Sequence, residues 1–237
     1  MTTLILVHGA CHGGWCWERV MPLLEAEGVR VLAPDLPEWQ PGARDPIGFW
    51  GEFVADLARA QAPEDRVILC GHSRGGVVIS AAAEAAPEAV SGLIYLAASL
   101  LPRGQTLTGT WRAYTDLAAE WVAPEPDEAS FRIAPGCYQR MFCPDSDTAT
   151  AAQAEARLRT EPFAAFATPM RITPERFGSV PRAYVETSRD MVIPLDFQRR
   201  MEAALPCDPV VTLDADHSPF LAMPERLAEV LIEICRR

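Results

Sequence analysis

The strongest chemical signal in the sequence is a serine placed between two glycines. Ser73 lies in the stretch Gly71-His72-Ser73-Arg74-Gly75, directly after an apolar run and before a helical pattern. A strand, a G-x-S-x-G turn and a helix in this order form a nucleophile elbow, where side chains in place of the two glycines would collide with neighbouring elements. We therefore predict that Ser73 is an acyl-transfer nucleophile. The alternative is a glycine-rich helix start that Ser73 caps.

A serine hydroxyl is a weak nucleophile at neutral pH, so this prediction requires a general base, and the sequence contains four histidines. His8 and His12 lie in one loop after the first apolar run, and the side chain of His72 is expected to point away from Ser73. His217 lies in the loop after the last apolar run, where chains with such an elbow carry the base. We predict that His217 is the base; the alternative is a solvated loop histidine.

The acid that orients the base is expected between these two residues, in the chain order serine, acid, histidine. Asp190 follows the apolar run 183–186, from which it could accept the imidazole N–H and stabilise the imidazolium. The alternatives are Asp196, Asp208, Asp214 and Asp216. Of these, the first falls on the following helical pattern, the second precedes a strand-like run, and the last two are close in sequence to the histidine. We therefore predict that Asp190 is the acid.

Acyl transfer also requires N–H donors that face the developing oxyanion. The backbone of Arg74 supplies one donor in such an elbow, and we expect the backbone of Ala10, after the first apolar run, to supply the other. The Arg74 guanidinium either extends to an acidic neighbour or the surface, or it tunes the pocket and positions an anionic substrate group. No cluster of His, Asp and Glu has metal-ligand spacing, so we expect neither a metal nor a cofactor.

These residues need a scaffold in which several strand ends meet, and the sequence predicts one. Runs rich in Val, Ile and Leu, typical of strands covered on both faces, occupy residues 3–7, 29–33, 66–70, 92–97, 183–186 and 209–213. Helical patterns occupy residues 15–27, 46–60, 73–86, 194–205 and 224–234. This alternation predicts an α/β fold with a mainly parallel sheet flanked by helices.

The interval 102–178 interrupts the alternation. It is punctuated by proline, it has helical patterns at residues 111–121 and 148–159, and no strand is predicted in it. A stretch this long between two strands indicates a helical cap over the carboxyl edge of the sheet. We expect a single domain in which residues 1–101 and 179–237 form the core and residues 102–178 form the cap. Some of the cap aromatics are expected to line an apolar pocket.

Composition restricts the partners and the compartment. The net charge is −11 and there is no lysine, so neither nucleic acid nor an anionic membrane surface is an expected partner. The chain opens without a signal-peptide pattern and has no long uncharged apolar segment. Its seven cysteines show neither zinc spacing nor a disulfide framework, which favours reduced thiols in the cytoplasm. The oligomeric state is left open, a homodimer included.

Four blocks of the sequence carry a family resemblance. They are "LILVHGACHGGWCWERVMPLLEAEGVRVLAPDLP", "VILCGHSRGG", "TPERFGSVPRAYVETSRDMVIPLDFQRRM" and "DADHSPFLAMPERLAEVL". In this order they resemble the α/β-hydrolase branch that contains plant methylesterases, salicylate-binding esterases and hydroxynitrile lyases. The resemblance is weakest in the cap. It implies the α/β-hydrolase fold with about six strands, a triad of Ser73, Asp190 and His217, and oxyanion donors at Ala10 and Arg74.

Members of this branch use the same triad for two different reactions, ester hydrolysis and hydroxynitrile cleavage. The lyases resemble one another in a threonine at the position of Gly9, a glutamate at that of His72 and a lysine at that of Ser218, and all three are missing here. Because a cation beside the base stabilises departing cyanide, the absent lysine favours hydrolysis of small to medium methyl, aryl or alkyl esters. The alternatives are a hydroxynitrile-lyase-like or other non-hydrolytic triad enzyme, and a ligand receptor that retains a hydrolase site.

Overall fold

A six-stranded parallel sheet forms the centre of the computed structural model, which describes residues 1–42, 44–112, 121–126 and 128–237. The strand order is β2-β1-β3-β4-β8-β9. The strands are β1 (Thr2–Val7), β2 (Val29–Leu32), β3 (Arg66–His72), β4 (Gly92–Leu96), β8 (Arg182–Thr187) and β9 (Val210–Leu213). The predicted strands and the α/β-hydrolase fold are thus confirmed. Because all six strands are parallel, their carboxyl ends meet at one edge.

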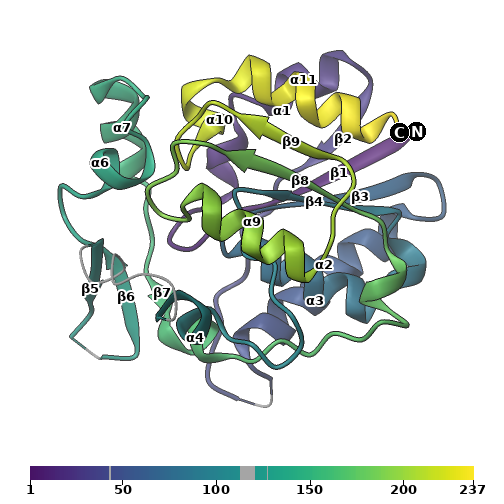
Figure 1. Cartoon of the computed structure of the whole chain (residues 1–237), viewed down its shortest axis with the longest axis horizontal. Coiled ribbons are helices and arrows are strands. Elements are labelled where there is room, and N and C mark those ends of the chain that lie inside the picture. Colours follow the sequence, from purple (N-terminus) through teal and green to yellow (C-terminus); the bar gives the residue numbers. More distant parts are fainter. Residues whose placement is uncertain (43, 113–120, 127) are drawn as a thin grey trace.

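Helices cover both faces of this sheet, as the apolar strands require. Figure 1 shows α1 (Met21–Ala26) and α11 (Pro224–Cys235) on one face, and α2 (Pro46–Gln61), α3 (Gly75–Ala85) and α9 (Leu195–Ala204) on the other. Local signals start these helices. Asp45 caps α2 by accepting a hydrogen bond from the Gly48 N–H at 2.7 Å, and a proline occupies the first turn of α1, α2 and α11.

One predicted helix is divided. The pattern over residues 15–27 consists of a 3₁₀ turn, η1 (Gly14–Trp17), followed by α1 from Met21. The proline at position 22 explains the break, because a proline lacks the N–H needed inside a helix and is tolerated in its first turn. The other 3₁₀ turns are η2 (Pro87–Ala89) and η3 (Phe177–Ser179).

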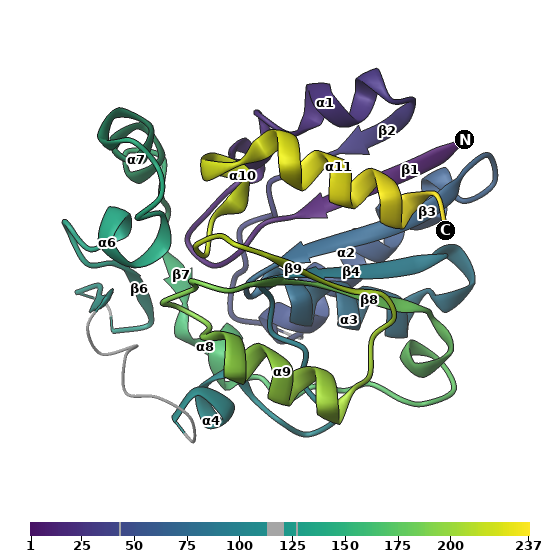
Figure 2. The same ribbon diagram turned by 45° about the horizontal axis from the view of Figure 1, so that its top comes forward.

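Most of the interval 102–178 lies off the carboxyl ends of the strands, at the end of the molecule opposite the two termini (Figure 2). Its last residues run back to the C-terminal end of α3, where Thr173 and Arg176 donate hydrogen bonds to Glu84 and Ala85. The helices among its described residues are α4 (Leu107–Arg112), α6 (Tyr138–Phe142), α7 (Thr148–Glu155) and α8 (Phe163–Ala167). The expectation that it has no strand is wrong. β5 (Val122–Pro124), β6 (Ser130–Ile133) and β7 (Glu161–Pro162) form a three-stranded antiparallel sheet. Strands of three, four and two residues are too short to show alternating polarity in the sequence.

Two helices were predicted in this interval, over residues 111–121 and 148–159. The helix predicted over residues 111–121 falls mostly on residues 113–120, which lie outside the described residues, and α4 ends at Arg112. The helix predicted over residues 148–159 is present as α7 and ends four residues early. Among the helices of the described ranges, none combines the length and the apolar character needed to cross a membrane.

Candidate active site

The turn between β3 and α3 holds Ser73 in a strained conformation. Its φ of 54° lies in the left-handed region, which costs a non-glycine residue about 1–3 kcal/mol. A Cβ on Gly71 would lie 2.6 Å from the Gly75 carbonyl oxygen, and a Cβ on Gly75 would lie 2.6 Å from the Val7 carbonyl oxygen. Both glycines are therefore required by close backbone approach. The turn presents the Ser73 side chain at the carboxyl edge of the sheet.

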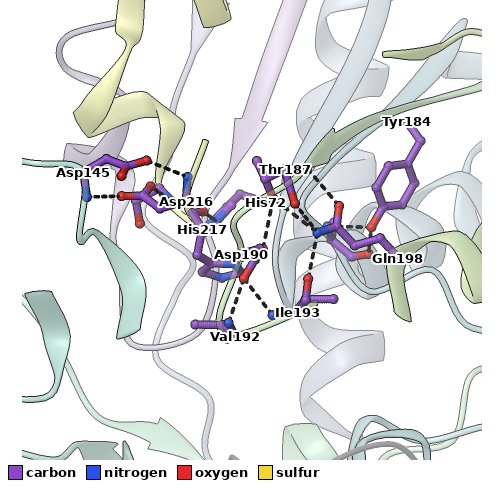
Figure 3. Close-up of polar contacts among 12 residues, drawn as sticks. His72, Asp145, Tyr184, Thr187, Asp190, Val192, Ile193, Gln198, Asp216 and His217 are labelled. Carbon is purple, nitrogen blue, oxygen red and sulfur yellow. Dashed lines mark hydrogen bonds and ion pairs between the residues drawn. The ribbon is translucent and has the colours of Figure 1, made fainter. Parts of the chain in front are cut away.

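His217 follows β9 and is fully buried, so it is not a solvated loop histidine. Its Nδ1 lies 2.7 Å from Oδ2 of Asp190 (Figure 3). Its Nε2 is also buried and has no hydrogen-bond partner within the described parts of the chain. Ser73 and His217 line one cavity, so the structure brings together the three residues that the sequence singled out.

Asp190 lies just after β8 and is held by four donors. Its Oδ1 accepts hydrogen bonds from the backbone N–H groups of Val192 and Ile193, at 2.7 and 2.8 Å. Its Oδ2 accepts from the Thr187 hydroxyl at 3.0 Å, in addition to the His217 contact. Because the carboxylate is held at both oxygens, its direction is fixed. The ring nitrogen that faces it must carry a proton, which leaves the other nitrogen of the base free to accept one.

Gln198 on α9 supports this turn from behind. Its side-chain oxygen accepts from the Thr187 N–H at 3.1 Å, and its amide nitrogen donates to the carbonyl oxygens of Thr187 and Ile193, at 3.1 and 2.7 Å (Figure 3). The side chain is fully buried. Gln198 therefore closes the turn that carries Asp190. Nothing in the sequence indicates this role, because a lone glutamine on a helix carries no motif.

The loop of the candidate base is tied to the interval 102–178. Asp216 accepts from the Asp145 N–H at 2.9 Å, and Asp145 accepts in return from the Asp216 N–H at 3.1 Å (Figure 3). The other Asp216 oxygen accepts from the Ser218 N–H at 2.8 Å. Burial raises the pKa of Asp216. The backbone N–H groups on either side of His217 are thus held by two carboxylates, that of Asp216 by Asp145 and that of Ser218 by Asp216.

His72 lies against the candidate base, although the sequence assigned it no role. Its Nε2 donates to the His217 carbonyl oxygen at 2.8 Å, and the centres of the two rings are 4.6 Å apart. Complete burial lowers the pKa of His72 well below its usual value, so the ring is neutral. A cation at this position would repel a protonated base.

The loop after β1 carries the candidate oxyanion donor and is organised by two neutral histidines. His8 Nδ1 donates to the Gly9 carbonyl oxygen at 2.8 Å, and its Nε2 accepts from the backbone. His12 Nδ1 donates to the Ala10 carbonyl oxygen at 2.7 Å, and its Nε2 accepts from the Tyr138 hydroxyl. Burial lowers the pKa of His8 to about 3 and that of His12 to about 4. Ala10 and Arg74 line the same cavity as Ser73.

The side chain of Arg74 is directed at an acidic neighbour. Its Nε lies 3.0 Å from Oε1 of Glu161 in β7, and both side chains are buried. The guanidinium also lies over the ring of Trp50, 4.6 Å from its centre. The charge of Arg74 is therefore compensated inside the protein, so it is not free to bind an anionic substrate group.

The cavity beside Ser73 is narrow and mostly apolar. Its free volume is about 10 Å³, enough for roughly one water molecule. It is lined by Ala10, Cys11, His12, Ser73, Arg74, Ser99, Leu107, Trp111, Trp121, Ile133, Phe142, Phe166, Val192 and His217. A larger surface groove at Trp39 and Met170 includes neither Ser73 nor His217. The interval 102–178 supplies the tryptophans and phenylalanines of this lining, Trp111, Trp121, Phe142 and Phe166.

Comparisons with known proteins show which family the chain and its fold resemble. The model of the alpha/beta hydrolase family matches residues 4–230. The pyrethroid hydrolase of Sphingobium wenxiniae is 37% identical over 98% of this chain and 87% of its own length. Methylesterase 3 of Arabidopsis thaliana is 29% identical, covering 99% and 96%. The crystal structure of a pyrethroid hydrolase from Sphingobium faniae superposes with a TM-score of 0.85 at 35% identity, covering 99% of this chain and 97% of the other.

Proposed function

The chain belongs to the alpha/beta hydrolase family and is a carboxylic ester hydrolase, and from that premise we propose that Ser73 is its nucleophile, His217 its base and Asp190 its acid. The observation that carries the proposal is the 2.7 Å contact between His217 and Asp190, together with the cavity that His217 and Ser73 both line. Ala10 and Arg74 supply the oxyanion donors through their backbone N–H groups.

The reaction follows from these positions. The Ser73 Oγ attacks the ester carbonyl carbon while its proton passes to Nε2 of His217, and Asp190 stabilises the imidazolium that forms. The carbonyl oxygen becomes an oxyanion that accepts from the N–H groups of Ala10 and Arg74. Collapse expels the alcohol, which takes the proton from His217 and leaves an acyl-enzyme. A water molecule, deprotonated by the same imidazole, then attacks this ester, releases the acid and regenerates the serine.

The substrates we propose are uncharged small to medium esters with methyl, alkyl or aryl groups. Arg74 is the one residue with a permanent charge among the described residues that line the cavity, and Glu161 compensates it. The aromatic lining suits an apolar acyl or alcohol group. The related pyrethroid hydrolase and methylesterase fit this class by name.

For the setting of the enzyme we propose the cytoplasm. Five cysteines are buried and form no disulfide: Cys11, Cys16, Cys70, Cys143 and Cys235. Buried thiols in this number suit a reducing compartment. Burial raises the pKa of Cys11, which lies beside the candidate site, so its thiol stays protonated and does not compete with the serine as nucleophile.

The test is a pair of matched serine variants. Ser73→Ala is expected to reduce hydrolysis of 4-nitrophenyl butyrate by at least about 10⁴-fold, because it removes the nucleophile. Ser80→Ala removes another buried hydroxyl, two turns along α3, and is expected to keep the activity. The measurement is initial rate with the melting temperature of each variant. Turnover of the folded Ser73→Ala protein close to that of the wild type would refute the proposal.

A further inference from the structure

A buried ion pair joins the nucleophile elbow, the loop after β1 and the interval 102–178. Arg74 comes from the elbow and Glu161 from β7, 87 residues away in sequence. Their side chains are 2% and 5% exposed. Beyond the 3.0 Å contact between Nε and Oε1, a terminal guanidinium nitrogen lies 3.3 Å from Oε2. Such a pair is costly to desolvate, and stability alone does not explain it.

Both members of the pair also bind the backbone on either side of Ala10. The guanidinium of Arg74 donates to the Gly9 carbonyl oxygen at 3.0 Å. The Oε2 of Glu161 accepts from the Cys11 N–H at 3.1 Å. Cys11 has a φ of 61°, in the left-handed region, so the loop needs outside contacts to hold this conformation. The pair therefore binds the loop at the Gly9 carbonyl and the Cys11 N–H, the two groups that flank the candidate oxyanion donor.

The bond to Gly9 has a direct geometric consequence. The Gly9 carbonyl and the Ala10 N–H belong to one planar trans peptide unit, so they point in opposite directions. When Arg74 and His8 hold the oxygen on one side, the N–H must point to the other side. Ala10 lines the cavity together with Ser73, which makes the cavity the place that this N–H can serve. A cation bound to the carbonyl also polarises the unit and strengthens its N–H as a donor.

We propose that Arg74 and Glu161 are positioning residues for the oxyanion hole, with Arg74 aiming the Ala10 N–H through the Gly9 carbonyl and Glu161 holding both Arg74 and the Cys11 N–H. This inference rests on the proposed function, since it takes Ser73 as the nucleophile and Ala10 as a donor. It gives the Arg74 side chain a role apart from binding substrate. It also makes the oxyanion loop depend on β7, because Glu161 lies on that strand.

The decisive variant replaces the pair by two apolar side chains of similar length, Arg74→Met together with Glu161→Met. Because no charge is left unpaired, this double variant is expected to fold, with a melting temperature lowered by a few degrees because the Cys11 N–H loses its acceptor. The Gly9 carbonyl loses its cationic donor, so kcat is expected to fall by about 10- to 100-fold, less than the loss of a whole oxyanion donor. KM is expected to change by less than about twofold, because the oxyanion forms after binding.

A transition-state analogue separates positioning from general damage. The serine oxygen adds to the carbonyl carbon of an aryl trifluoromethyl ketone, and the carbonyl oxygen becomes an oxyanion in the oxyanion hole. The affinity of this inhibitor for the double variant should therefore weaken by about the same factor as kcat. As a control, Arg157→Met with Glu18→Met removes an exposed pair and should change neither quantity. A folded double variant with wild-type kcat and wild-type inhibitor affinity would overturn the proposal.

A second variant covers the case in which the double variant does not fold. Glu161→Gln keeps an oxygen for the Cys11 N–H and leaves the Arg74 charge uncompensated, so kcat and inhibitor affinity should fall together while KM holds. Unchanged kcat and inhibitor affinity in that folded protein would overturn the role of Glu161. Failure of the proposed function looks different: Ser73→Ala would then retain turnover, whatever the ion-pair variants do.

Discussion

The substitution Asp190→Asn tests how the acid controls the tautomer of the base. In the structure, Oδ1 of Asp190 accepts from the two backbone N–H groups of Val192 and Ile193. The asparagine oxygen must keep this place, since the opposite orientation would set an NH₂ group against two N–H donors. The amide NH₂ therefore faces Nδ1 of His217, now 2.7 Å from Oδ2. That nitrogen then has to accept, so the proton moves to Nε2 and the base cannot take the serine proton.

The expected magnitude follows from this geometry. A wrong tautomer in a serine triad lowers kcat by about 10⁴-fold, which corresponds to about 5 kcal/mol at about 1.36 kcal/mol per tenfold change. The fold should persist, because the two backbone contacts remain. Asp196→Asn, an exposed carboxylate on α9 that the sequence left as an alternative acid, serves as the control and should keep wild-type kcat. The assay is steady-state hydrolysis of a 4-nitrophenyl ester with each melting curve. An Asp190→Asn enzyme within tenfold of the wild-type kcat would show that Asp190 does not set the tautomer of His217.

Two further predictions concern stability and the elbow. His12 is neutral when folded, with a pKa of about 4, and has a pKa of about 6.5 when unfolded, so the unfolded chain binds the extra proton between these values and stability falls as the pH drops through them. Between pH 7 and pH 5 this effect lowers the free energy of unfolding by roughly 2 kcal/mol. Urea unfolding at the two pH values should therefore show a loss of stability about 2 kcal/mol smaller for His12→Asn than for the wild type. Equal losses in the two proteins would contradict a neutral His12 in the folded state. Gly75→Ala places a Cβ 2.6 Å from the Val7 carbonyl oxygen. It should therefore lower the free energy of unfolding by roughly 2 kcal/mol or more and reduce activity at 25 °C. A variant as stable and as active as the wild type would contradict the close approach of the two backbone segments.

Much of this architecture is predictable because its signals are local. Most strands of this doubly covered parallel sheet are short runs rich in Val, Ile and Leu, and the turns and loops after three of the strands carry Ser73, Asp190 and His217. Parallel strands end at one edge, so residues far apart in sequence were expected to meet there. The structure places these residues at that edge. Asp190 lies in the turn after β8, and its carboxylate contacts His217.

What could not be predicted depends on contacts between distant segments. The ion pair of Arg74 with Glu161 spans 87 residues, and neither residue carries a motif that names the other. The contact of His72 with the His217 backbone spans 145 residues. The small antiparallel sheet in the interval 102–178 is built from strands too short for periodicity to show. These features are set by packing of the whole chain, which a single sequence does not display.

In the proposed mechanism, the acyl group of the substrate is bound covalently to the Ser73 oxygen before water releases it. The most direct measurement is rapid acid quenching during turnover of a 4-nitrophenyl ester, followed by trypsin digestion and mass spectrometry. Cleavage after Arg66 and Arg74 yields a peptide of residues 67–74 in which Ser73 is the one hydroxyl side chain. This peptide is expected to gain the mass of the acyl group, and fragmentation is expected to place that group on Ser73. An acyl group on another residue, or a rapid burst of nitrophenol with this peptide unmodified, would contradict this mechanism.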